Sequence, residues 1–243
     1  MLELIILGSS VGVLSGFFGI GGGTILVPLL LVLGLGIKEA IGISTVQMVF
    51  SSVFGSYLNH KKGNLDIKMV STIGIGGFIG ASLSGNIASY FSPKTLEIVF
   101  LAFVFFALLR LFIKTKEVEE KLKIHPLKLF LVGLLLGAVS MTIGVGGSLI
   151  LVPILVGFWH VPLKKSISAG LFFVVFSSFP GMISHTIAGH VDFEKGLVIG
   201  LASLVGVYLG IYLKDKVGSD LQKKLLVCFY ATIVIYLTYR IFI

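Results

Sequence analysis

The sequence predicts an all-α integral membrane protein of two inverted repeats, each a glycine-broken helical hairpin followed by three transmembrane helices. Of the 243 residues, 56% are hydrophobic and 12% are charged. An average soluble domain has a charged share of about a quarter. The apolar residues also gather in long runs, several near the roughly 20 residues that a membrane span needs. Composition and run length together therefore exclude a soluble globular protein.

A glycine-rich element occurs twice and divides the chain into two halves. Residues 19–28 read GIGGGTILVP, and residues 144–153 read GVGGSLILVP. Further on, FSSVFG at residues 50–55 matches FSSFPG at residues 176–181. The halves are predicted to be a first repeat at residues 1–113 and a second at 127–243, joined by a charged linker loop at 114–126 that we expect to be cytoplasmic, and together they form one domain.

The apolar runs have the same order in both halves. Two short runs flank each glycine element, and three longer runs follow. The runs cover about residues 2–18, 24–34, 39–60, 68–90 and 95–113, and then 127–142, 148–158, 165–188, 195–213 and 221–243. The second run of each half would be a helix of about 16 Å, which is too short to span a bilayer alone.

The lysines and arginines predict the direction of the halves. In the first half they cluster after the third and fifth runs, at residues 61–68 and 110–128, whereas in the second half they precede the third and fifth runs, at 164–165 and 214–224. Cytoplasmic loops are enriched in these residues. Equivalent loops therefore lie on opposite faces, and the repeats are inverted. The first two runs of each half form a hairpin, either re-entrant or of two thin spans, and the glycine tips meet near the bilayer middle.

Composition also excludes several functions. The net charge of +8 comes from lysines in short loops between apolar runs, so a nucleic-acid partner is not expected. The single cysteine, Cys228, is predicted to be a buried structural thiol, and neither a metal nor a cofactor is expected. Every acidic residue lies at a run end or in a loop. Cation transport, which normally needs an intramembrane carboxylate, is therefore disfavoured.

The two glycine elements are the candidate substrate site. Each begins a short helix whose first amides lack intrahelical partners, so that each can bind an anion. Broken helices at equivalent positions of two repeats are typical of a transporter site. The alternative is that the glycines only allow close helix packing. The candidate substrate-binding residues are Gly19, Gly21, Gly22, Gly23, Thr24, Gln47, Ser51, Gly144, Gly146, Gly147, Ser148 and Ser177.

Gln47 differs from the serines in this set. Its buried amide must find partners, and its equivalent in the second half is Phe173, so the substrate path is predicted to be asymmetric. Ser51 and Ser177 have an alternative role, because serine often bonds to its own helix backbone in membranes.

Three further residues are candidates for proton coupling. They are His185, Asp66 and Asp192, of which the histidine has an unperturbed pKa near 6.5. Helix caps and ordinary hydrogen bonds in loops are the alternative role for all three. They lie at the ends of runs, so either role agrees with their position in the sequence.

These features resemble the sulfite exporter family, TauE/SafE, which is named for taurine and sulfoacetate metabolism. The resemblance rests on the repeated GxGGG-x-ILVP element, its distance from the FSS stretch and the two-half design, and it covers nearly the whole chain. In the second copy, Ser148 stands where the first has Gly23. The resemblance implies a multi-pass protein of a prokaryotic inner membrane that moves sulfite, thiosulfate, an organosulfonate or another small sulfur-containing anion.

The sequence thus predicts a secondary transporter that works by alternating access, and the resemblance favours an exporter. Its expected partners are the sulfur anion and membrane lipid, with a homodimer left open. An anion channel is the mechanistic alternative, and a non-transporting scaffold or receptor would leave the mirrored glycine breaks unexplained. An enzyme is not expected, since no histidine lies near an intramembrane carboxylate or cysteine. The sequence has no ATP-binding motif, so transport driven by ATP within this chain is not expected.

Overall fold

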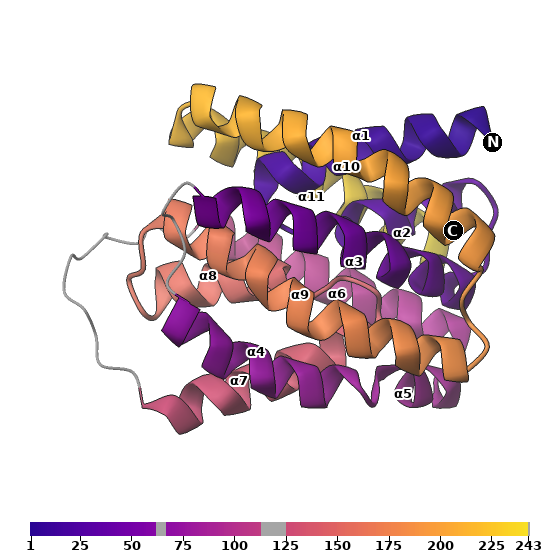
Figure 1. Ribbon diagram of the computed structural model, residues 1–243. Helices are drawn as coiled ribbons and strands as arrows, with labels where there is room; N and C mark the ends of the chain where they lie inside the picture. Colours follow the sequence, from indigo (N-terminus) through magenta and orange to yellow (C-terminus); the bar gives the residue numbers. More distant parts are fainter. Residues whose placement is uncertain (62–66, 113–124, 243) are drawn as a thin grey trace.

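The computed structural model describes residues 1–61, 67–112 and 125–242, and all regular secondary structure in these residues is helical (Figure 1). The helices are α1 (Leu2–Phe18), α2 (Gly23–Val32), α3 (Ile37–Lys61), α4 (Ile67–Ala81), α5 (Ser84–Tyr90), α6 (Pro93–Phe112), α7 (Pro126–Thr142), α8 (Ser148–Gly157), α9 (Leu163–Ile187), α10 (Phe193–Lys216) and α11 (Ser219–Phe242). Each predicted apolar run is helical, and the short helices α2 and α8 begin at the glycine elements.

The fourth run differs from the expected single helix. It is broken into α4 and α5, which meet at a bend of 42°. The hydroxyl of Ser82 donates to the Phe78 carbonyl at 2.8 Å, and that of Ser84 donates to the Ala81 carbonyl at 2.7 Å. Such local bonds compete with helical ones. The Gly85 amide, in turn, donates to the side chain of Ser184 in α9 at 2.9 Å, so the break is stabilised from a neighbouring helix.

The described helices form a membrane protein. α3, α9, α10 and α11 are long and apolar enough to cross a bilayer, and α4 with α5 would make a fifth, bent span. α2 and α8 have 10 residues each, which makes helices of about 15 Å. Cys228 is exposed on α11, so the expectation of a buried thiol was wrong. Only 22% of the apolar window of α11 is buried, and its other side chains face outward as a lipid-exposed surface would.

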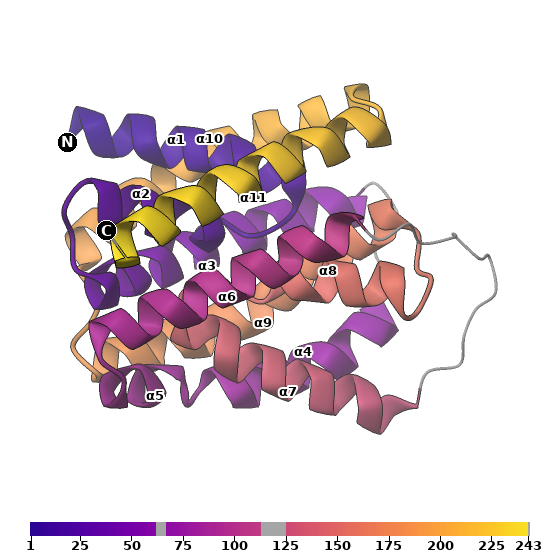
Figure 2. The same ribbon diagram turned by 180° about the vertical axis from the view of Figure 1, so that it is seen from behind.

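Each hairpin packs against a helix of the other half through its first helix. α1 lies along α10, and α7 lies along α4 (Figure 2). The backbones are very close, because a Cβ added at Gly12 would overlap the Ser203 carbonyl, and one added at Gly133 would overlap the Ile73 carbonyl. Small residues permit this approach between membrane helices. The packing of one half is thus repeated by the other.

The equivalent helices α3 and α9 run antiparallel. Gly42, near the start of α3, packs against His190, which follows the end of α9. Asn59, near the end of α3, accepts a hydrogen bond from Ser168, near the start of α9, at 3.2 Å. In Figure 1, α3, α6 and α10 accordingly end at the side where α7 and α9 begin. Inverted repeats require this relative direction.

Basic residues are distributed unequally between the two ends of the bundle. The end where α3 and α10 finish, called here the lysine-rich end, carries Lys61, Lys128, Lys165, Lys214, Lys216, Lys223 and Lys224. At the opposite end, Lys195 pairs with Glu39 and Asp192, and Arg240 pairs with Glu97. The lysine-rich end is therefore the more positive of the two, and we expect it to be cytoplasmic.

Thiol labelling tests this orientation. Cys228→Ser removes the single cysteine, after which Tyr90→Cys and Lys61→Cys mark the two ends at exposed positions. We expect a membrane-impermeant maleimide to label the cysteine at position 90 on intact cells, and the one at position 61 only after permeabilisation. Labelling of both from the same side would contradict the inverted arrangement.

Candidate functional site

The two glycine elements meet inside the bundle. A Cβ added at Gly23 would overlap the carbonyl oxygen of Gly144, and the Ser44 hydroxyl donates to the same oxygen at 3.0 Å. The α1–α2 hairpin starts from the end that holds the N-terminus, and the α7–α8 hairpin starts from the lysine-rich end (Figure 1). The tips thus approach each other from opposite ends, as expected from the sequence.

Glycine is needed at these tips for two different reasons. Gly146 and Gly147 both have φ of 78°, and Gly19, Gly21 and Gly144 are also left-handed. An L side chain rarely adopts this conformation. Gly22 instead has φ of −69°, and there the reason is space, because a Cβ would overlap the Oε1 of Gln47. Both tips therefore need glycine for backbone conformation, and Gly22 of the first tip needs it for space.

The first turns of α2 and α8 present buried amides. Within the described part of the chain, no protein group accepts from the amides of Gly22, Gly23 and Thr24, or from those of Gly147 and Ser148. These residues are buried, as are the glycines around them. An unpaired buried donor costs about 1–3 kcal/mol. A bound anion would satisfy several of these donors at once.

Three polar side chains beside these amides also lack a described partner. They are the hydroxyls of Thr24 and Ser148 and both carboxamide atoms of Gln47, and all three residues are 0% exposed. The Gln47 carboxamide lies against Gly22. At the equivalent place in the second half, the Phe173 ring lies 2.5 Å from a Cβ added at Gly147. A carboxamide therefore lies beside the first glycine of this pair, and an aromatic ring lies beside the second.

The candidate serines differ in what they contact. Ser177 donates to the Gly146 carbonyl at the second tip at 3.3 Å, and it also bonds to its own helix. Among the described residues, Ser51 bonds to the Met48 carbonyl alone, at 3.4 Å, which is the alternative role expected for it. Ser178 was not among the candidates, although its buried hydroxyl has no described partner.

Met48 is a further residue that the sequence did not single out. Its sulfur lies 2.9 Å from a Cβ added at Gly23 and 2.7 Å from one added at Gly146. The thioether therefore packs between the two tips. Its position beside Gln47 on α3 is the only sequence signal that would have identified it.

The family follows from comparison with known proteins. Residues 4–237 match the family model described as Sulfite exporter TauE/SafE. The chain belongs to this family. A probable membrane transporter protein of Methanocaldococcus jannaschii is 27% identical over 236 residues, covering 88% of this chain and 86% of the relative. No solved structure matches the chain significantly.

Bacterial TauE/SafE relatives show the same coverage. A probable membrane transporter protein of Bacillus subtilis is 27% identical over 223 residues, covering 88% of this chain and 89% of its own. A probable membrane transporter protein of Haemophilus influenzae is 25% identical over 243 residues, which cover 93% of this chain and 90% of the relative. The chain is thus a multi-pass membrane transporter of a bacterial and archaeal family.

In this TauE/SafE protein, His185 lies at the end of α9 away from the lysine-rich end. It is fully buried, its Nε2 donates to the Met141 carbonyl at 3.0 Å, and its Nδ1 lies 3.1 Å from Nδ1 of His190. Met141 is in the last turn of α7, three residues before the second tip. The imidazole is thus linked to the base of the tip, and a role in proton coupling stays a proposal.

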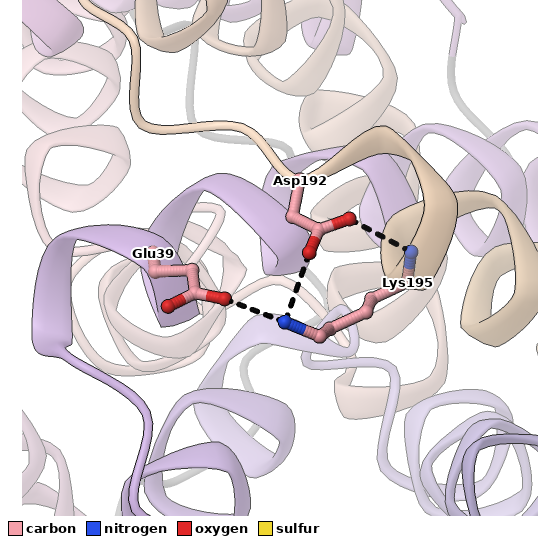
Figure 3. Close-up of polar contacts among 3 residues, drawn as sticks. All are labelled: Glu39, Asp192 and Lys195. Carbon is pink, nitrogen blue, oxygen red and sulfur yellow. Dashed lines mark hydrogen bonds and ion pairs between the residues drawn. The ribbon is translucent and has the colours of Figure 1, made fainter.

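Asp192 is at the start of α10 and is a helix cap. Its carboxylate accepts from the Lys195 amide at 3.0 Å and pairs with the Lys195 ammonium at 2.9 Å, while that ammonium also pairs with Glu39 at 2.8 Å (Figure 3). The hydrogen bonds from the side chain and the amide of Lys195 lower the pKa of the Asp192 carboxyl. These contacts are those of the alternative, capping role. Asp66 lies outside the described residues.

The described residues include no group of three or more His, Cys, Asp or Glu side chains that could hold a metal ion. The groups available to a substrate at the tips are neutral: amides, hydroxyls and the Gln47 carboxamide. Such a site can bind an anion through oriented dipoles without a fixed positive charge.

Proposed function

We propose that this membrane transporter is a secondary transporter of a small sulfur-containing anion such as sulfite, thiosulfate or an organosulfonate. The observation that carries the proposal is the meeting of two helix N-termini whose buried amides, with Gln47, Thr24 and Ser148, have no described protein partner. The family description supplies the sulfur class of the substrate. The anion is held at the glycine tips.

The chemistry of these donors suits an oxyanion. Sulfite and sulfonates present three oxygens around one sulfur, and each oxygen accepts hydrogen bonds from several directions. A hydrogen bond to a charged group contributes about 1.5–3 kcal/mol. Amides from both tips can therefore bind one anion together, while the Phe173 ring limits the space on the second side.

The packing on either side of the tips favours alternating access over an open channel. Towards the lysine-rich end, Gly55 is covered by Leu171, Val207 and Ile211. Towards the other end, Gly181 is covered by Met141. An anion at the tips would be enclosed in this arrangement, so one of these contacts must separate before it leaves. A channel would need both sides to be open together.

Flux measurements with purified protein in liposomes test this function. Sulfite, thiosulfate, sulfoacetate, sulfate and taurine form the panel. We expect saturable uptake of at least one sulfur anion. With the membrane potential held at zero, we also expect labelled anion to accumulate transiently above its outside concentration in liposomes loaded with unlabelled anion, because a carrier couples the two fluxes and a channel does not. Flux without such exchange would favour the channel. Absence of both binding and flux for all the anions would overturn the proposal.

A further inference from the structure

We infer that His185 and His190 form a binding site for one proton, and that this proton strengthens the binding of the anion at the glycine tips. The inference rests on the proposed function, because it names an ion whose binding is coupled to that of the substrate. His185 is near the end of α9, and His190 is in the loop that leads to α10, at the end of the bundle opposite to the lysine-rich end.

A chain of four hydrogen-bonding contacts runs through the histidine pair. The His185 Nε2 donates to the Met141 carbonyl at 3.0 Å, and the two Nδ1 atoms are 3.1 Å apart. Nε2 of His190 lies 3.4 Å from the Ser89 hydroxyl oxygen, and that hydroxyl donates to the Gly85 carbonyl at 3.0 Å. The chain thus leads from an exposed serine to a fully buried imidazole.

The number of hydrogens in this chain indicates its charge. Each neutral imidazole has one N–H and the serine has one O–H, so a neutral chain has three hydrogens for the four contacts. One proton taken from solvent makes His190 a donor at both nitrogens, and every contact then has a hydrogen. A second proton would place two N–H groups against each other between the rings. The geometry therefore suits one added proton and not two.

The Met141 carbonyl connects the pair with the second tip. Besides the imidazole, it accepts from the Gly144 amide at 3.1 Å, and the carbonyl of Gly144 packs against Gly23 of the first tip. Met141 is also in the last turn of α7, where the helix dipole favours a positive charge. A proton on the pair is thus held at the base of the second tip, and it attracts an anion bound to the amides there.

Other charged groups face the pair from α3 and α10. Lys38 of α3 donates to a carbonyl of α5 at 3.2 Å. Lys195 of α10 pairs with Glu39 and Asp192, so these three charges largely offset one another (Figure 3). Among the described residues, α7 has no charged side chain at this end. The remaining titratable side chains of α5 and α10 at this end are exposed, and they are Tyr90 and Glu194.

These surroundings decide the direction of the pH effect. Partial burial and the charge of Lys38 lower the pKa of His190, so the pair is largely neutral near neutral pH while no anion is bound. An anion at the tips offsets both effects and raises this pKa, and a proton is therefore taken up with the anion. Because linked binding is reciprocal, a fall in pH strengthens anion binding by the same factor.

The first repeat has asparagine at both equivalent positions. They are Asn59 and Asn64, of which Asn64 lies outside the described residues. A carboxamide donates and accepts hydrogen bonds, but it does not titrate as an imidazole does. Proton binding of this kind thus belongs to the second repeat, at the end that we expect to face away from the cytoplasm.

Anion binding measured at two pH values tests the proton site. The variants are His185→Asn and His190→Asn, each of which introduces the residue type of the first repeat. His60→Asn, at an exposed position of the lysine-rich end, is the matched control. Thiosulfate and sulfoacetate are the probes, because neither titrates between about pH 6 and about pH 8, on either side of the unperturbed histidine pKa.

We expect the Kd of wild type and of His60→Asn to fall by at least about fivefold from the higher pH to the lower one. A pH-indicating dye should also report proton uptake when the anion binds. In His185→Asn and His190→Asn, the Kd should change by less than about twofold between the two pH values, and binding should take up no proton.

Each outcome supports or overturns the proton site. If wild type binds the probes equally well or more weakly at the lower pH, or if either histidine variant is folded and keeps the full pH dependence, the proton site is overturned while the tip site stands. If His185→Asn does not fold, His190→Asn decides, because His190 is only partly buried. If wild type binds neither probe nor sulfite at either pH, the proposed function itself fails, and the proton site fails with it.

Discussion

We expect Gln47→Leu to make the protein more resistant to heat and nearly inactive in transport. Both carboxamide atoms of Gln47 are fully buried without a described partner, which costs about 1–3 kcal/mol for an unpaired buried polar group. Leucine removes this cost and is close to glutamine in size. It also removes the polar group beside Gly22, so sulfite flux should fall by at least about tenfold, as the loss of one charge-assisted hydrogen bond predicts.

Thermal unfolding in detergent, with and without sulfite, measures stability and sulfite binding on the same sample, and flux into liposomes measures transport. Ser51→Ala is the matched control, since Ser51 lies one turn away on α3 and, among the described residues, bonds to its own helix alone. It should change neither the unfolding temperature nor the sulfite-induced shift appreciably. If Gln47→Leu lowers the unfolding temperature and keeps the full sulfite shift, then Gln47 is a packing residue and the substrate binds elsewhere.

Helix positions and the meeting of the tips could be predicted from the sequence, because both depend on local signals. Apolar runs fix where helices form, and the repeated glycines fix where α2 and α8 begin. The alignment of the halves predicted that Gln47 and Phe173 occupy equivalent positions. Accordingly, the Gln47 side chain lies against Gly22, and the Phe173 ring lies against the equivalent Gly147. The break between α4 and α5 was missed although Ser82 and Ser84 mark it, because serine also occurs within unbroken helices of this protein, such as α3.

The direction of individual side chains could not be predicted. Cys228 and Met48 both lie in apolar helices, yet one is exposed and the other is buried between the tips. Lipid-facing and core-facing positions are equally apolar in a membrane protein, so hydropathy does not separate them. Lys214 was counted with the loop lysines, because only the packing of α10 on α3 shows that it points inward.

Packing alone and substrate binding predict different results for two neighbouring glycines. A Cβ at Gly23 would overlap the backbone carbonyl of Gly144, which cannot move without separating the tips. A Cβ at Gly22 would overlap only the end of the flexible Gln47 side chain, and φ of −69° suits alanine. Gly23→Ala should therefore lower the unfolding temperature strongly, whereas Gly22→Ala should fold normally.

Gly22→Ala should nevertheless lower sulfite flux by at least about tenfold, because the new methyl group displaces the Gln47 carboxamide and covers amides of the first tip.

Thr24→Ala is the milder comparison, since it removes one hydroxyl hydrogen bond worth about 0.5–1.5 kcal/mol, which corresponds to a loss of affinity of roughly 2- to 13-fold. Flux and the sulfite-induced thermal shift, compared at equal folded fraction, measure the order of these effects. Binding at the tips requires that Gly22→Ala lose the shift while remaining folded. If it keeps both the shift and the flux, the glycines of the first tip serve only to pack the helices.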